Sequence, residues 1–163
     1  MKRLALILVA ACALVAGCGD DDTSGPSNAP VVFSTLLSPA NEVPPIANNE
    51  SIATGATQIS IDTSSNTVNL YFQIIGLAAG TNLVGAHIHP GVAGVNGPVV
   101  VSTGLTAGMP LTTPSNATEF NITVAIDPAL AQAIIANPSG YYFNVHTTMN
   151  PGGVARGQLV RIQ

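Results

Sequence analysis

The sequence has 163 residues, of which 47% are hydrophobic and only 7% are charged, and its formal net charge is −4. With four basic residues against eight acidic ones, nucleic acid and anionic lipid headgroups are poor electrostatic partners. Tryptophan is absent and aromatic residues make up 4% of the chain, which argues against a carbohydrate-binding module built on flat aromatic side chains.

The first predicted element, residues 1–17, is an export signal. Lys2 and Arg3 precede an apolar run that is too short to span a bilayer but suits the hydrophobic region of a signal peptide. Small residues lead into Cys18, and this arrangement resembles the bacterial lipobox, in which the cysteine is lipidated and becomes the new N-terminus. The alternative is an ordinary signal peptide cleaved near Ala16. Both interpretations place the protein outside the cytoplasm, and we expect a lipoprotein anchored to the membrane of the bacterial cell envelope through Cys18.

The next segment, residues 18–30, is predicted to be a flexible acidic tether, because it has too little apolar surface to offset the entropy of ordering it. Residues 31–163 then form one domain, long enough to bury about two-thirds of its unfolded surface. Cys12 lies in the signal peptide, so the mature chain keeps one cysteine and forms no intramolecular disulfide. Loss of the signal leaves two basic residues against eight acidic ones, a net charge of −6.

Alternation of apolar and polar residues predicts β-strands along nearly all of this domain. In the segment TVNLYFQII, for example, Val68, Leu70 and Phe72 point to one side and the polar residues between them to the other. This pattern is typical of antiparallel sheets with one solvated face. The expected strands are residues 31–37, 54–61, 67–75, 84–89, 98–103, 119–126, 141–147 and 154–162.

One segment departs from this alternation. DPALAQAIIANPSG has Asp127 as a plausible N-cap, Pro128 at the first helical position and a Pro-Gly stop, so it predicts a short helix across one end of the sheets. Eight strands and one helix predict an all-β fold, an antiparallel Greek-key β-sandwich or barrel with one short helix.

The most informative polar residues are the three histidines. His87 and His89 are alternate residues of one expected strand and His146 lies on another, so if their apolar neighbours face the core, all three lie on the outer face. Alternate residues of a strand are about 6.6 Å apart on one face, so two imidazoles can converge on one ion. Three imidazoles without a thiolate suit copper or zinc, with water completing the shell. The alternatives are that the pair only holds the adjacent glycine-rich loop, or that it acts as a pH switch titrating near pH 6.5.

Arg156 follows the flexible PGG turn and is the next candidate site residue. Its fork of donors could guide an anion toward the histidines; the alternative is a surface arginine or one paired with a carboxylate, with Glu42 a candidate partner. The chain contains no G-x-S-x-G, P-loop or G-x-G-x-x-G motif, and its carboxylates form no recognisable acid/base pair. The sequence therefore favours a protein that is not an enzyme.

Three blocks, FSTLLSPANEVPPI at residues 33–46, AHIHPGVAGVNGPVVV at residues 86–101 and YYFNVHTTMNPGGVARGQL at residues 141–159, resemble the signature blocks of the CHRD domain. This module is named after the animal protein chordin and is widespread in secreted microbial proteins. The resemblance covers nearly all of residues 31–163, and it implies an extracytoplasmic all-β module without a settled activity.

A more remote resemblance is to the copper/zinc superoxide dismutases, which carry an H-x-H pair on one strand, another copper histidine on a later strand, and a glycine-rich loop leading to an anion-guiding arginine. His87, His89 and His146 match the copper ligands, and Arg156 matches the arginine. No histidine remains for the bridging position or for zinc, so the resemblance implies a copper-only site.

Two functions are therefore expected. The first is an exported, lipid-anchored CHRD module with a non-enzymatic binding or envelope-structural role, and the alternative is a copper-binding or redox protein. The residues name no protein or ligand partner.

Overall fold

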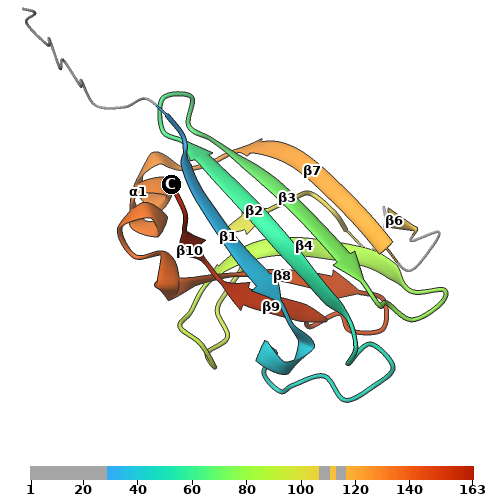
Figure 1. The fold of residues 1–163 in the computed structure, drawn as a ribbon. Helices are drawn as coiled ribbons and strands as arrows, with labels where there is room; N and C mark the ends of the chain where they lie inside the picture. The colour runs from blue at the N-terminus through green and yellow to red at the C-terminus, as the bar shows by residue number, and fades with distance from the viewer. Residues whose placement is uncertain (1–28, 107–110, 113–116) are drawn as a thin grey trace, which may run out of the picture.

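A computed structural model of the chain describes residues 29–106, 111–112 and 117–163. The predicted signal peptide, Cys18 and nearly all of the tether lie outside the described residues. Within the described part, ten strands form two antiparallel sheets that pack face to face (Figure 1). The expected all-β sandwich with one short helix is confirmed; over the residues described, the sheets do not close into a barrel.

The first sheet is built on the alternating segments recognised in the sequence. Phe33, Ile59, Leu70 and Phe72 are fully buried, whereas Tyr71 between the last two is not, as the period of two predicts. Its strand order is β10-β1-β2-β3-β7. The bounds are β1 Val31–Leu37, β2 Thr54–Asp62, β3 Thr67–Ile75, β7 Ala117–Ala125 and β10 Val160–Arg161.

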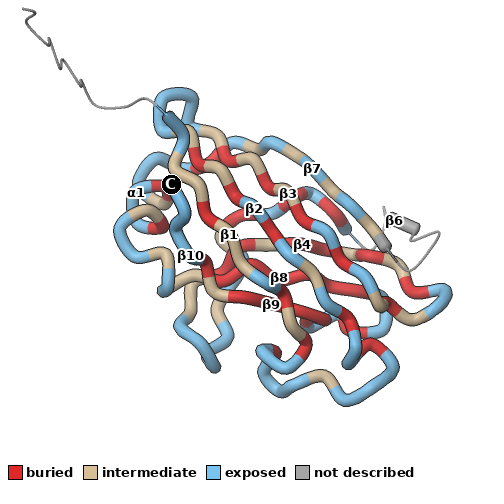
Figure 2. Tube along the Cα trace, in the orientation of Figure 1, coloured by how far each residue is buried: buried red, intermediate tan, exposed pale blue. Residues whose placement is uncertain are grey.

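The second sheet faces the first across the hydrophobic core (Figure 2). The rings of Phe72 and Phe143, one from each sheet, have their centroids 5.5 Å apart, and this contact lies in the middle of the sandwich. The strand order is β5-β4-β8-β9, with β6 also paired to β4. The bounds are β4 Asn82–Pro90, β5 Val101–Ser102, β6 Leu111–Thr112, β8 Tyr141–Thr147 and β9 Ala155–Gln158.

Two of the expected strands differ from the structure. The strand expected at residues 98–103 is only the two-residue β5, because the segment before it runs over the outer face of β4 as a loop. The strand expected at residues 154–162 divides at the buried Leu159, where the chain leaves the second sheet and β10 pairs with β1 of the first. One continuous alternating segment therefore connects the two sheets.

The helix α1, Pro128–Ala136, begins where the sequence predicts. The Asp127 side chain accepts hydrogen bonds from the backbone amides of Ala129 and Leu130, at 2.9 and 3.0 Å, which satisfies two of the amides left free in the first turn. Ala131 and Ile134 are buried in the core, so α1 closes one end of the sandwich (Figure 1). Short 3-10 turns occupy Pro39–Asn41 and Pro138–Gly140. No helix in the described part of the chain is long and apolar enough to cross a membrane.

Candidate metal centre

The three histidines gather on one face of the second sheet. β4 and β8 are paired neighbours, with Gly85 opposite His146 and His87 opposite Asn144. The residues that alternate with the histidines, such as Ile88 and others of the core cluster, face the first sheet, so the imidazoles point away from the core as predicted. This face is nevertheless not open to solvent: His89 and His146 are only 6% and 8% exposed, and His87 is partly buried.

The imidazoles are close enough to share one ion. The ring centroids of His87 and His146 are 4.8 Å apart, and His89 lies 5.7 Å from His87 and 6.0 Å from His146. One nitrogen of each ring lies within 4.8 Å of one nitrogen of both others. Two nitrogens bound to the same metal at about 2.0 Å can be no more than about 4 Å apart. Closing the cluster around a metal therefore requires movements of less than about 1 Å.

Hydrogen bonds to two loops determine which nitrogen His89 and His146 present. His89 Nδ1 lies 3.0 Å from the carbonyl oxygen of Gly97, and His146 Nδ1 lies 3.0 Å from that of Pro151. A carbonyl only accepts, so both Nδ1 atoms carry the proton and both Nε2 atoms keep a lone pair. His89 Nε2, His146 Nε2 and His87 Nδ1 are buried and have no hydrogen-bond partner within the described residues.

The surroundings keep these rings neutral. Burial, with smaller contributions from the nearby His146 and His89, lowers the pKa of His87 from 6.5 to about 4. Burial is also the largest cause of the lowered pKa of His89 and of His146. Metal ligation requires neutral imidazole, so the site is ready for a cation at neutral pH. Because the pKa of each histidine is lowered, a pH switch centred near pH 6.5 is not expected.

Gly85 makes room for the rings. A Cβ atom at this position would lie 2.8 Å from His87 Cε1 and 3.4 Å from His146 Cδ2. The first distance is shorter than a van der Waals contact, so a larger residue would push the His87 ring aside. The pairing register of β4 and β8 also shifts between Leu83 and Gly85, which places the glycine under both rings.

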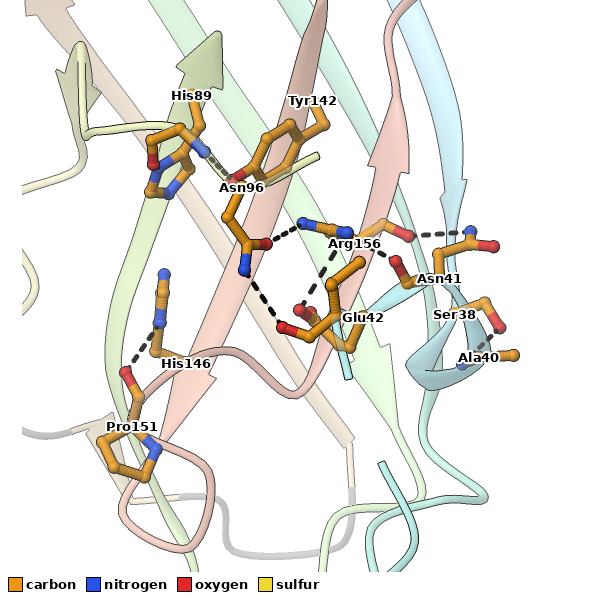
Figure 3. A network of polar contacts seen from close by, with 12 residues as sticks. Ser38, Ala40, Asn41, Glu42, His89, Asn96, Tyr142, His146, Pro151 and Arg156 are labelled. Atoms are coloured by element: carbon orange, nitrogen blue, oxygen red, sulfur yellow. Dashed lines mark hydrogen bonds and ion pairs between the residues drawn. The ribbon is translucent and has the colours of Figure 1, made fainter. Parts of the chain in front are cut away.

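Arg156, on β9, lies beside this cluster but is almost fully buried, at 2% exposure. Its Nε donates to the backbone carbonyl of Asn41 and lies 4.0 Å from Glu42 Oε2, and its Nη1 donates to Asn96 Oδ1 at 2.7 Å (Figure 3). The structure thus shows the carboxylate pairing considered from the sequence, and anion guidance stays a prediction. Burial raises the pKa of Glu42 to about 7, although Arg156 and the Asn144 amide act to lower it.

Tyr142, which packs against His89, and Glu50, a buried carboxylate, were not predicted from the sequence. The Tyr142 ring stacks on the His89 ring, with the centroids 4.9 Å apart and the planes 5° from parallel. The Arg156 guanidinium lies 4.7 Å from the centroid of the Tyr142 ring and makes a cation–π contact with it. Strand alternation places Tyr142 on the same face as His146, so a signal was present. Glu50, fully buried, accepts from Thr147 Oγ1 and Asn150 Nδ2, both at 2.6 Å, and no local pattern marks it.

The fold and the site define a class of protein, a small β-sandwich with a buried three-histidine cluster on the outer face of one sheet. A family model described as CHRD domain matches residues 33–159. The chain therefore belongs to the CHRD domain family, as its signature blocks indicated. No curated protein and no solved structure matches the chain significantly. The family membership is consistent with a binding module of extracellular type.

Proposed function

We propose that this CHRD domain is a copper-binding module that uses His87, His89 and His146 as its ligands. Two observations carry the proposal: one nitrogen of each ring lies within 4.8 Å of one nitrogen of both others, and each ring has a buried nitrogen without a hydrogen-bond partner among the described residues. A buried polar atom without a partner costs about 1–3 kcal/mol. A bound metal would supply the missing partner to all three atoms at once.

The ligand set supports copper over other ions. Magnesium and calcium take oxygen ligands, and the three-residue cluster contains no carboxylate. Imidazole suits copper and zinc, and Cu²⁺ binds nitrogen ligands most tightly of the divalent first-row metals. Three ligands leave one coordination position for water or another small molecule. The resemblance of the histidine pattern to the copper site of superoxide dismutases supports the same choice.

We further propose that the module works outside the cytoplasm, anchored through a lipid on Cys18. The support comes from the sequence: a basic start, an apolar run and small residues before the cysteine, followed by an acidic tether. An oxidising compartment does not harm such a site, because imidazole ligands, unlike cysteine thiolates, do not need a reducing environment.

The test is a metal titration of the purified, metal-free full chain with Cu²⁺ and with Zn²⁺, followed by metal analysis after dialysis. We expect one equivalent of copper and an electron paramagnetic resonance spectrum with nitrogen hyperfine structure. Replacing His87, His89 or His146 singly with alanine should abolish stoichiometric binding. Asn121→Ala is the matched control, because Asn121 is exposed and bonds to Asn69 on the first sheet.

Three results would overturn the proposal. Less than a tenth of an equivalent of copper would favour the metal-free binding or envelope-structural role instead. Zinc retained in preference to copper at equal concentrations would refute the choice of metal. Copper that remains bound after all three histidines are replaced would place the site elsewhere.

A further inference from the structure

We propose that Arg156 is a positioning residue for the copper ligand His89, acting through Asn96 and Tyr142 rather than on an incoming anion. The inference rests on the proposed function and adds to it the residue that determines the orientation of one ligand. Arg156 is well placed for this because it contacts both the loop above His89 and the ring against which His89 packs.

The first connection runs through the loop between β4 and β5. Arg156 Nη1 donates to Asn96 Oδ1 at 2.7 Å, and the Asn96 amide donates to the carbonyl of Val43 at 3.1 Å. The next residue, Gly97, supplies the carbonyl that accepts from His89 Nδ1 at 3.0 Å. Asn96 itself is exposed, so this short segment is held in place by two hydrogen bonds rather than by packing of its side chain in the core.

The second connection runs through Tyr142. Its ring lies between the His89 imidazole and the Arg156 guanidinium, at 4.9 and 4.7 Å respectively (Figure 3). Its hydroxyl accepts from the backbone amide of Gly97 at 3.1 Å. Gly97, whose carbonyl fixes the tautomer of His89, is therefore held at its backbone amide by Tyr142, and the preceding residue, Asn96, is held through its side chain.

Two of the three guanidinium nitrogens of Arg156 donate to the protein, and the third, Nη2, is buried without a hydrogen-bond partner among the described residues. Nε bonds to the carbonyl of Asn41, Nη1 bonds to Asn96, and the side chain is 2% exposed beside Glu42. Because the side chain is covered by protein, an anion arriving from solvent would not reach this guanidinium without displacing the residues above it. The planar guanidinium has donors in fixed directions and so bonds to Asn41 and Asn96, on two different loops, at the same time. A lysine ammonium on a flexible chain does not reproduce this geometry.

The experiment compares full-length Asn96→Ala, Asn96→Asp and Arg156→Lys with the wild type, and Asn121→Ala is again the control. Asn96→Ala breaks the connection at an exposed residue, so folding is preserved. Asn96→Asp keeps the acceptor for Arg156 and loses only the donor to the Val43 carbonyl, so it isolates the contact with Arg156. Arg156→Lys keeps the positive charge but loses the fork. We expect Asn96→Ala and Arg156→Lys to weaken copper binding by about tenfold to a hundredfold, the range for residues that orient a metal ligand. Asn96→Asp should stay within about threefold of the wild type.

A second readout needs no metal. In the ¹⁵N-labelled metal-free protein, His89 should be one tautomer with the proton on Nδ1, and Asn96→Ala should add the tautomer protonated on Nε2. An unchanged tautomer and unchanged copper affinity in Asn96→Ala would overturn the inference. An Arg156→Lys protein that matches the wild type would reduce the role of Arg156 to its charge and overturn it as well. If the wild type binds no copper, the proposed function fails, and the tautomer measurement still decides whether Arg156 and Asn96 position His89.

Discussion

Acidification is expected to destabilise the metal-free protein through its buried histidines. Burial lowers the pKa of His87 from 6.5 to about 4, so between these values the unfolded chain binds a proton that the folded chain rejects. The stabilising contribution of the neutral ring is complete above pH 6.5 and is lost as pH falls toward 4. The difference in pKa corresponds to about 3 kcal/mol. His89 and His146 act in the same direction, since their pKa values are also lowered.

Glu42 acts in the opposite direction over the same interval. Its pKa is raised from 4.5 to about 7, mainly by burial, so the folded chain holds a proton that the unfolded chain releases. Its contribution to stability is complete below pH 4.5 and is lost as pH rises through 7, and it amounts to about 3 kcal/mol. Glu42 and His87 nearly cancel between pH 4.5 and 6.5. The net loss of stability on acidification therefore comes from His89 and His146.

The measurement is urea unfolding at several pH values from 4.5 to 7.5, followed by far-ultraviolet circular dichroism because the chain contains no tryptophan. Glu42→Gln removes the opposing contribution. It should steepen the fall of the unfolding free energy with decreasing pH by about 1.4 kcal/mol per pH unit. Asp62, whose pKa is lowered to about 2, titrates below this interval. The reasoning is refuted if the wild type gains stability between pH 6.5 and 4.5, or if Glu42→Gln leaves the slope unchanged.

Two further substitutions test the space beside the His87 ring and a buried hydrogen-bond network at the end of β8. Gly85→Ala should weaken copper binding at least tenfold while the fold is retained, because the added methyl would lie 2.8 Å from His87 Cε1; wild-type affinity by calorimetric titration would contradict this. Glu50→Ala should lower the unfolding free energy by about 3 kcal/mol, because it leaves two buried donors, on Thr147 and Asn150, without their acceptor. A loss below about 1 kcal/mol in urea unfolding would show that these donors find other partners.

Local patterns in the sequence predicted most of the fold. The alternation around Phe72 fixes which side chains enter the core, and the Asp127-Pro128 pair marks the start of α1, because both depend on interactions within a few residues. The two-residue β6, Leu111–Thr112, carries no such signal. The division of the last strand at Leu159 could not be predicted either, because the alternation of a segment does not indicate which sheet it joins.

The site was predictable in part for the same reason. Alternation placed His87, His89 and His146 on the face away from the core, and only the pairing of β4 with β8 brings them together. Their burial was not predictable, because it depends on loops that fold back over the sheet. Glu50 illustrates the limit most clearly: its partners Thr147 and Asn150 are about a hundred residues away along the chain.

The distribution of hydrogen bonds around the rings argues that the histidines are more than a support for the loops. A histidine that only held a loop would use one nitrogen for that purpose and leave the other in solvent or on a second partner. Here the loop carbonyls of Gly97 and Pro151 occupy Nδ1 of His89 and His146, while the opposite nitrogens are buried without a partner in the described part of the chain. Together with Nδ1 of His87, which is also buried without a partner among the described residues, these atoms cost several kcal/mol in a domain whose total stability is about 5–15 kcal/mol. A metal ion bound by one nitrogen of each ring would offset this cost, and the rings each present a nitrogen within 4.8 Å of the other two.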